Sequence, residues 1–265
     1  MKKLILFLAV VLFGNAINSQ VSPQKKQQEN RREEKKKKIN DLIRQDEEGV
    51  LVYKKQSLLG LQLRNSGYGL FYEHGRMRSQ RNTTIYRLDF TETKHQKEQK
   101  LPEGGFSFSN PYIYGKINNF YQFHLGFGKQ RILGQKGNKN GIAVSTQYGG
   151  GVLVGLLRPY YVNVLENGES KTIKYTSQDS SLFVGGYILG GGGLSKGWNE
   201  MKIKPGAFLK TSLRFDFGRF NEVVSAIEFG VSGEFYSEKI PILLFQQDKQ
   251  FYLNGHIALV FGHRK

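Results

Sequence analysis

The feature that most constrains the fold is a long alternating segment near the end of the chain, Gln250 to Phe261. One parity of this segment is apolar and carries Phe251, Leu253, Ile257, Leu259 and Phe261, whereas the other parity is mostly polar. Alternation with a period of two is typical of a strand with one apolar and one polar face. The segment exceeds the roughly five or six residues usual in soluble strands and fits the roughly 9–11 residues of a tilted transmembrane strand. It therefore predicts a transmembrane β-barrel.

Composition agrees with a barrel and excludes several other classes. The mean hydropathy is −0.46, and the sequence has no helical run of about 18 apolar residues, which excludes a helical membrane protein. A barrel is compatible with such values because its lipid-facing residues alternate with polar ones. The chain contains no cysteine, which excludes disulfides, thiolate metal sites, cysteine nucleophiles and a lipidated cysteine anchor.

The first residues predict an exported protein. Lys2 and Lys3 precede an apolar run from Leu4 to Phe13 and then small residues, so residues 1–19 are predicted to form a cleaved signal peptide. We therefore expect a Gram-negative cell-envelope protein located in the outer membrane. The net charge of +17 favours anionic partners such as lipid phosphates or acidic proteins, and export argues against nucleic acid.

Residues 20–49 are highly charged and polar and are predicted to form a periplasmic tether. Acidic and basic residues three and four apart favour a short exposed helix. The same composition is also typical of a solvated, disordered segment, so both alternatives stand.

Residues 50–265 contain eight alternating segments long enough to span a membrane. They are 56–64, 68–77, 83–94, 120–131, 142–157, 206–217, 223–236 and 250–261. The predicted fold is all-β, an antiparallel up-and-down transmembrane barrel with eight strands. Long outer loops are expected at 94–119 and 158–205. The second loop contains a predicted hairpin that turns at Asn167 and a further predicted strand, LFVGGYIL, and the barrel would have ten strands if both spanned the membrane.

The lengths of the connections support the count of eight independently of the alternation. Three connections that would share the periplasmic side are short, at 78–82, 134–140 and 218–221. The two longest connections fall on the opposite side, as expected for outer-membrane barrels.

The polar face of the predicted strands carries charges that would have to pair inside a narrow lumen. The expected network consists of Lys210, Arg214, Asp216, Glu228 and Glu234, with Glu228 close to both Lys210 and Arg214. An eight-stranded barrel has room for side chains but little for a channel, so we predict a plugged barrel. The main structural alternative is a soluble barrel of the lipocalin type, with an apolar interior and a polar exterior.

Three histidines, His74, His124 and His256, are expected on polar faces. Ser145, Ser212, Glu228 and Glu234 are their candidate partners, and an arrangement of Ser, His and acid would give a lipid-modifying hydrolase. This alternative depends on His124, His256 and Glu228. No local motif brackets the serines, the run GGGGLSKG does not match a phosphate-binding loop, and no residues cluster at metal-ligand spacing. We therefore expect no catalytic residues, no cofactor and no metal.

Basic residues gather at the predicted periplasmic rim of the barrel. They are Lys129, Arg131, Lys136, Lys139, His263, Arg264 and Lys265. A solvated rim beside anionic lipid headgroups is the favoured interpretation, and a dedicated docking patch is the alternative.

Several stretches of the chain resemble an uncharacterised family of outer-membrane β-barrel proteins from the Bacteroidota. They are Tyr114 to Arg131, Lys136 to Ser145, Leu156 to Tyr161, Leu194 to Phe208, Arg214 to Glu222 and the terminal FGHRK. The resemblance implies the compartment and the fold but no activity.

We therefore expect a structural or accessory subunit of a cell-envelope assembly. Its expected partners are outer-membrane lipids and another envelope protein, and it is not expected to be an enzyme. The alternatives are a hydrolase at the barrel wall, acting on lipid A or phospholipid, and a small channel.

Overall fold

The computed structural model describes residues 32–34, 36, 39–40, 53–101, 111–137, 140–218 and 222–265. Contacts divide the chain into two units, Met1–Glu48 and Gly49–Lys265. In the first unit the described residues are helical and exposed, which agrees with the helical alternative for the charged segment. The predicted signal peptide lies outside the described residues. No helix in the described part of the chain is long and apolar enough to cross a membrane.

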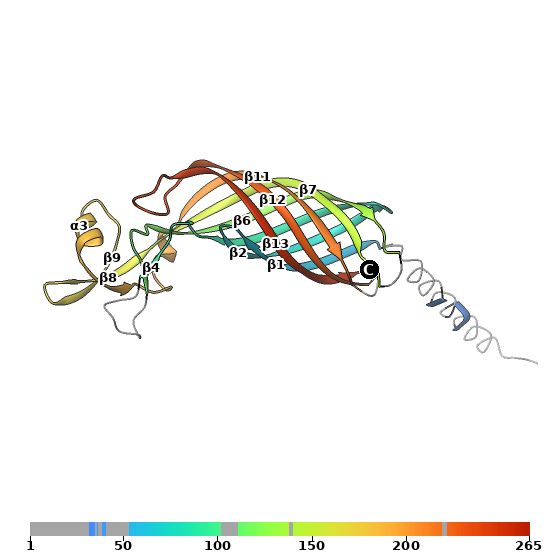
Figure 1. Ribbon diagram of the computed structural model, residues 1–265, viewed down its shortest axis with the longest axis horizontal. Helices are drawn as coiled ribbons and strands as arrows, with labels where there is room; N and C mark the ends of the chain where they lie inside the picture. The colour runs from blue at the N-terminus through green and yellow to red at the C-terminus, as the bar shows by residue number, and fades with distance from the viewer. Residues whose placement is uncertain are drawn as a thin grey trace, which may run out of the picture. The chain divides into compact units, whose positions relative to one another are not determined.

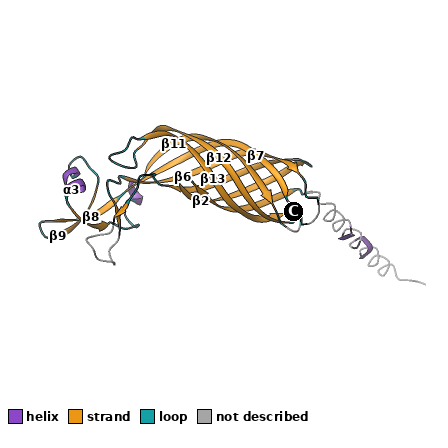
Figure 2. Cartoon of the chain, in the orientation of Figure 1, coloured by secondary structure: helices purple, strands orange, loops and turns teal. Residues whose placement is uncertain are grey.

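The second unit is built around a closed barrel of eight antiparallel strands (Figures 1 and 2). The strands are β1 (Lys55–Arg64), β2 (Gly67–Ser79), β3 (Asn82–Thr93), β6 (Asn118–Gly134), β7 (Ala143–Pro159), β11 (Lys202–Asp216), β12 (Val223–Ile240) and β13 (Lys249–Arg264). Each barrel strand pairs with the next in sequence, and β13 pairs with β1 to close the barrel, with Leu61 opposite Leu259. The predicted eight-stranded, up-and-down barrel is confirmed.

The two ends of the barrel differ in their connections. At one end, here called the short-turn end, β2 joins β3, β6 joins β7 and β11 joins β12, and the chain leaves β13. At the other end, here called the long-loop end, long connections follow β3 and β7, and a shorter one follows β12. Only the turn from β1 to β2 at Asn65 and Ser66 is tight at this end. This asymmetry agrees with the predicted distribution of short and long connections.

The long connections contain small sheets of their own. The first contains β4 (Lys100–Leu101) and β5 (Tyr112–Ile113). The second contains β8 (Tyr161–Glu166), β9 (Glu169–Lys174), α3 (Ser180–Gly185), β10 (Tyr187–Gly191) and the short helix η1 (Trp198–Glu200). Strands β10, β8 and β9 form a separate sheet with its own core, made of Val162, Val164, Ile173 and Phe183. We call residues 160–201 the loop module.

The loop module confirms one prediction and corrects another. The hairpin of β8 and β9 turns at Asn167, which has a positive φ of 53°, as predicted. The single strand predicted for LFVGGYIL is wrong, because its first part belongs to α3 and its last part to β10. The helix is favoured because it buries Phe183 against the small sheet, and it ends before Gly186. None of these elements joins the barrel sheet, so the ten-stranded alternative is wrong.

Apolar side chains cover the outer wall of the barrel. Leu209 is 74% exposed and Leu253 is 68% exposed, although both lie in the middle of regular strands. Aromatic side chains pack on each other along this wall, as in the pair of Tyr86 and Phe127, with ring centroids 5.4 Å apart. Polar side chains fill the interior instead. This is the reverse of a lipocalin-type barrel and is the arrangement expected of a wall that faces lipid.

Candidate functional site

The lumen contains a network of charged side chains, here called the lumen network. Its ion pairs join five carboxylates to five cationic side chains: Glu73, Asp89, Asp216, Glu228 and Glu234, with Arg64, Arg87, Lys210, Arg214 and Arg264. Strand alternation places these side chains inside, since each belongs to the inward parity of its strand. The formal charges of these ten groups balance, as buried charges require.

Glu228 lies at the centre of the lumen network and is fully buried. It faces Arg214 directly across the ladder of β11 and β12, and Arg214 Nη2 lies 2.7 Å from its Oε2. Arg87 Nη1 donates to its Oε1 at 2.9 Å, and Lys210 Nζ lies 3.7 Å from the same oxygen. The structure thus brings together Lys210, Arg214 and Glu228, three of the residues singled out in the sequence.

Two arginines connect this centre to the other side of the barrel. Arg214 also binds Glu73 on β2 through two hydrogen bonds of 2.9 and 2.7 Å. Arg87 on β3 binds both oxygens of Asp89, at 3.1 and 3.2 Å, and its guanidinium carbon lies 3.3 Å from the centroid of the Phe71 ring. The two parallel hydrogen bonds between Arg214 and Glu73 form a bidentate pair, which fixes the positions of both partners. The network therefore ties β2 and β3 to β11 and β12 across the lumen.

The two remaining predicted carboxylates pair elsewhere. Glu234 binds Arg64 of β1, and His124 Nε2 lies 3.4 Å from its Oε1. Asp216 lies near the short-turn end, where Arg264 Nη1 is 2.7 Å from its Oδ2. The expectation of a single cluster is thus refined into a central group and two flanking pairs.

The network predicted from the sequence did not include five of these residues, namely Arg64, Glu73, Arg87, Asp89 and Arg264. All five belong to the inward parity of their strands, and this alternation was the sequence signal that could have placed their side chains in the lumen. Several of their partners come from strands that are not neighbours in the barrel, as with Arg87 of β3 and Glu228 of β12. Such contacts depend on closure and cannot be read from the alternation of one strand.

Apolar clusters flank the lumen network. Towards the long-loop end, Ile242 and Leu243 of the connection after β12 pack against a cluster that includes Phe120, Phe208 and Tyr236. Another cluster, on the inner face of β1, β2, β12 and β13, consists of Leu58, Phe71, Val224, Ala226, Ala258 and Val260. Side chains therefore fill the barrel both at the network and beside it.

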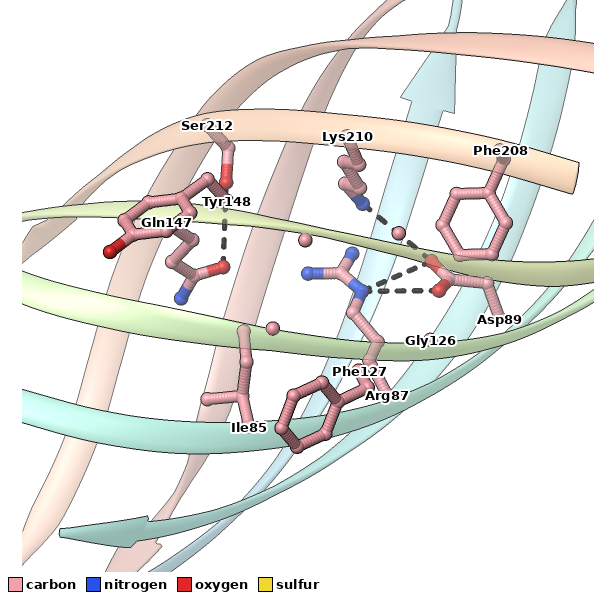
Figure 3. Close-up of a pocket in the computed structure, with 13 residues that line it drawn as sticks. Ile85, Arg87, Asp89, Gly126, Phe127, Gln147, Tyr148, Phe208, Lys210 and Ser212 are labelled. Carbon is pink, nitrogen blue, oxygen red and sulfur yellow. Dashed lines mark hydrogen bonds and ion pairs between the residues drawn. The ribbon is translucent and has the colours of Figure 1, made fainter. Parts of the chain in front are cut away.

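A small space remains beside the lumen network. It measures about 30 Å³ and is lined by Phe208, Lys210, Arg87 and Asp89, next to the glycines of β6 and β7 (Figure 3). Such a volume holds about one or two water molecules. This space is too small to form a channel by itself.

A buried ion pair lies within the connection between β3 and β6. Lys116 Nζ donates to Glu98 Oε2 at 2.8 Å, and the Lys116 backbone forms a bridge with Leu243. Burial lowers the pKa of Lys116, and the neighbouring Glu98 opposes this effect. The ion pair thus holds two parts of one connection together, and the backbone bridge joins this connection to the one after β12.

Two of the predicted histidines, His124 and His256, are paired with carboxylates rather than serines. His124 contacts Glu234, and His256 Nε2 lies 3.3 Å from Glu228 Oε1. In the described part of the chain, no serine hydroxyl forms a hydrogen bond with either of these rings. Both rings are buried.

His74 does not lie on a polar inner face, so that prediction is wrong. It belongs to the outward parity of β2, between the inward residues Glu73 and Gly75, and its Nδ1 is 3.4 Å from Ser57 Oγ. Among the described residues, no group of three His, Asp or Glu side chains could hold a metal ion.

The predicted basic rim is only partly present. Lys129, Arg131 and Lys265 are exposed at the short-turn end. Lys136 and Arg264 are buried, because Lys136 donates to the backbone carbonyl of Gly218 and Arg264 pairs with Asp216. Lys139 lies outside the described residues.

Comparisons with known proteins give weak similarities in structure. Neisserial surface protein A has a TM-score of 0.41 at 6% identity, over 80% of this chain and 96% of that chain. The Yersinia pestis attachment invasion locus protein Ail, in complex with the heparin analogue sucrose octasulfate, has a TM-score of 0.39 at 11% identity, over 81% and 100%. The N-terminal β-barrel domain of Pseudomonas aeruginosa OprF has a TM-score of 0.34 at 7% identity, over 79% and 100%.

These values support no inference about the family or activity of the chain. No protein-family model matches the chain, and no curated protein matches it in sequence. The resemblance to barrels of the Bacteroidota therefore stays a prediction.

Proposed function

We propose that this chain is a non-conducting outer-membrane β-barrel that serves as a structural or accessory subunit of a cell-envelope assembly. The observation that carries the proposal is the filled lumen, whose interior is occupied by ion pairs and apolar clusters. A barrel without a conduit fits an anchor that positions other parts of the chain.

The orientation follows from the connections. Outer-membrane barrels have short periplasmic turns and longer extracellular loops. The short-turn end, with the C-terminus, would then face the periplasm, and the loop module would face outward. The apolar outer wall supports insertion in a bilayer, because the exposure of large apolar side chains such as Leu209 and Leu253 to water is unfavourable.

The loop module is the part best suited to contact a partner. The apolar core of the loop module holds its small sheet in place. Four large apolar side chains are exposed on its surface, namely Leu165, Tyr187, Leu194 and Trp198. Aromatic and apolar side chains on a fixed surface are typical of protein contacts. We propose that this surface meets another envelope protein.

A replacement of the loop module tests this proposal. Lys202 pairs with Leu157 in the barrel ladder, so a short turn can join Pro159 to Lys202 in place of residues 160–201. A tagged copy of each protein would be purified from outer membranes in mild detergent, and the co-purifying proteins would be identified. We expect a stoichiometric partner with the complete chain and its loss with the shortened chain.

The barrel must be intact for this result to count. Folded barrels migrate as compact species in unheated gels, and both proteins should do so. Recovery of the complete chain without any partner would contradict the accessory role.

A hydrolase based on His124, His256 and Glu228 is not favoured by a specific observation. The carboxylates that contact these histidines, Glu234 and Glu228, also form ion pairs with arginines. We propose that these residues are structural, so that His124→Gln and His256→Gln leave the lipid A and phospholipid profiles unchanged.

A further inference from the structure

The outer surface near the short-turn end contains a basic depression, here called the basic groove. It has a volume of about 600 Å³. Its cationic lining residues are Arg78, Arg81, Lys129 and Arg131, and the rest of the lining consists of Ser79, Asn82, Thr83, Thr84 and Tyr148. No carboxylate of the part of the chain that the structure describes lines the basic groove, and all four cationic side chains are exposed.

The strand register explains why these cations gather. Lys129 and Arg131 share the outward parity of β6, and they pair with Thr84 and Asn82 of β3. Arg78 belongs to β2, which adjoins β3 on its other side, and Arg81 lies in the turn between these strands. The sequence thus places four positive charges on one patch, from strands β2 and β6 and from the turn between β2 and β3.

Among the described residues, these charges lack partners of opposite sign. None of the four forms an ion pair with any residue that the structure describes, in contrast to the cations of the lumen network. Like charges gathered on one patch repel each other, and an anion between them removes that cost. The basic groove is therefore electrostatically suited to an external anion.

Arginine is well suited to bind an oxyanion such as phosphate. Its planar guanidinium donates two parallel hydrogen bonds to phosphate oxygens, and three of the four cations here are arginines. The hydroxyl groups of Ser79 and Thr84 are further donors in the lining. More than one cation can thus contact one phosphate group.

The wall beside the basic groove is apolar. Lys129 lies opposite Tyr148 on β7, and the next outward residues along the wall are Phe127 and Tyr86, which face each other across β6 and β3. Phe127 is 54% exposed and Tyr86 is 52% exposed. A ligand with its phosphate in the basic groove would therefore lay an attached hydrocarbon chain along these rings.

We propose that the basic groove binds the phosphate headgroup of an anionic phospholipid. The proposal rests on the membrane location proposed above, in which the short-turn end meets the inner leaflet. The ligand combines phosphate, net negative charge and acyl chains, as in phosphatidylglycerol. A zwitterionic lipid offers the same phosphate, but its amine is repelled by the four cations.

Native mass spectrometry of the complete protein in detergent micelles tests this proposal. The protein would be titrated with phosphatidylglycerol, with phosphatidylethanolamine of the same acyl chains, or with inorganic phosphate. We expect phosphatidylglycerol to bind with at least about tenfold preference over phosphatidylethanolamine, and Arg78→Gln/Arg131→Gln to weaken its binding about tenfold or more. The control Lys171→Gln/Lys196→Gln removes the same charge from the loop module and should bind as the wild type does.

The other outcomes overturn the proposal. Equal binding of the two lipids would mean that the apolar wall alone retains them, and binding of inorganic phosphate without phosphatidylglycerol would mean a site for free phosphate. If Arg78→Gln/Arg131→Gln does not fold, Arg81→Gln/Lys129→Gln provides the same comparison.

A separate measurement distinguishes this proposal from the membrane location. The protein would be folded into vesicles of phosphatidylethanolamine and phosphatidylcholine, which contain no anionic lipid. Failure to insert would contradict the membrane location, whereas insertion without a preference for phosphatidylglycerol would contradict the lipid site alone.

Discussion

Replacement of Glu228 by glutamine should strongly destabilise the barrel. Glutamine keeps the volume of the side chain, so the change removes charge without opening a cavity. Arg87 and Arg214 then lose their shared carboxylate, and each keeps one other carboxylate as a close hydrogen-bonded partner, Asp89 and Glu73 respectively. Removal of one partner from a buried ion pair costs about 3–5 kcal/mol. Because Glu228 contacts both arginines, we expect the free energy of unfolding to fall by about that amount.

Urea titration of the protein folded into lipid vesicles measures this effect. The folded fraction can be read from the compact band in unheated gels. The matched control is Glu200→Gln, which makes the same chemical change in the loop module, where Glu200 pairs with Lys174 on the surface. We expect the control to keep the wild-type midpoint, because exposed ion pairs contribute little.

A fall of less than about 1 kcal/mol in Glu228→Gln would refute this reasoning. It would mean that the charges of the lumen network are compensated by something other than their protein partners. The double variant Glu73→Gln/Glu228→Gln extends the test, since it removes both carboxylates that bind Arg214. Its effect should exceed that of either single change.

Three further predictions concern other parts of the molecule. Arg158→Ala should shift the fluorescence of Trp198, the only tryptophan, because the Arg158 guanidinium lies 4.7 Å from that ring. The variant should still give the compact gel band, and an unchanged emission spectrum would contradict the contact. Lys249→Gln should raise the pKa of His95, because burial and, next in size, the positive charge of Lys249 hold this pKa below its usual value. The His95 ring would be titrated by NMR, and an unchanged pKa would contradict the effect of the Lys249 charge on His95. Gly151→Val should prevent closure of the barrel, since a Cβ at this position would lie 2.0 Å from the backbone oxygen of Leu125; a heat-modifiable variant would contradict this.

The strands of the barrel could be predicted because their signal is local. Leu59, Leu61 and Leu63 alternate with polar or small residues within β1, and no distant contact is needed to recognise the pattern. The pairing of Glu228 with Arg214 was also accessible, because the two strands are consecutive. Both predictions used only the period of a strand and the position of a turn.

Contacts across the lumen and within the loop module could not be predicted in this way. The pairs of Arg87 with Glu228 and of Arg264 with Asp216 join residues far apart in sequence. Lys136 looks like a rim residue, but it is buried by the distant backbone of Gly218. The helix α3 was missed because a short apolar run is compatible with either a strand or a helix, and packing of Phe183 decides between them.

We propose that the barrel encloses no conducting path, and a measurement of ion current across a bilayer tests this directly. The purified protein would be inserted into planar bilayers, and its insertion would be verified by recovery of the compact, heat-modifiable species from the membrane. We predict no discrete ion current at moderate voltage, since Phe120, Tyr236 and Leu243 pack together at the long-loop end and the lumen network fills the interior. Reproducible single-channel openings from the wild-type protein would contradict the account.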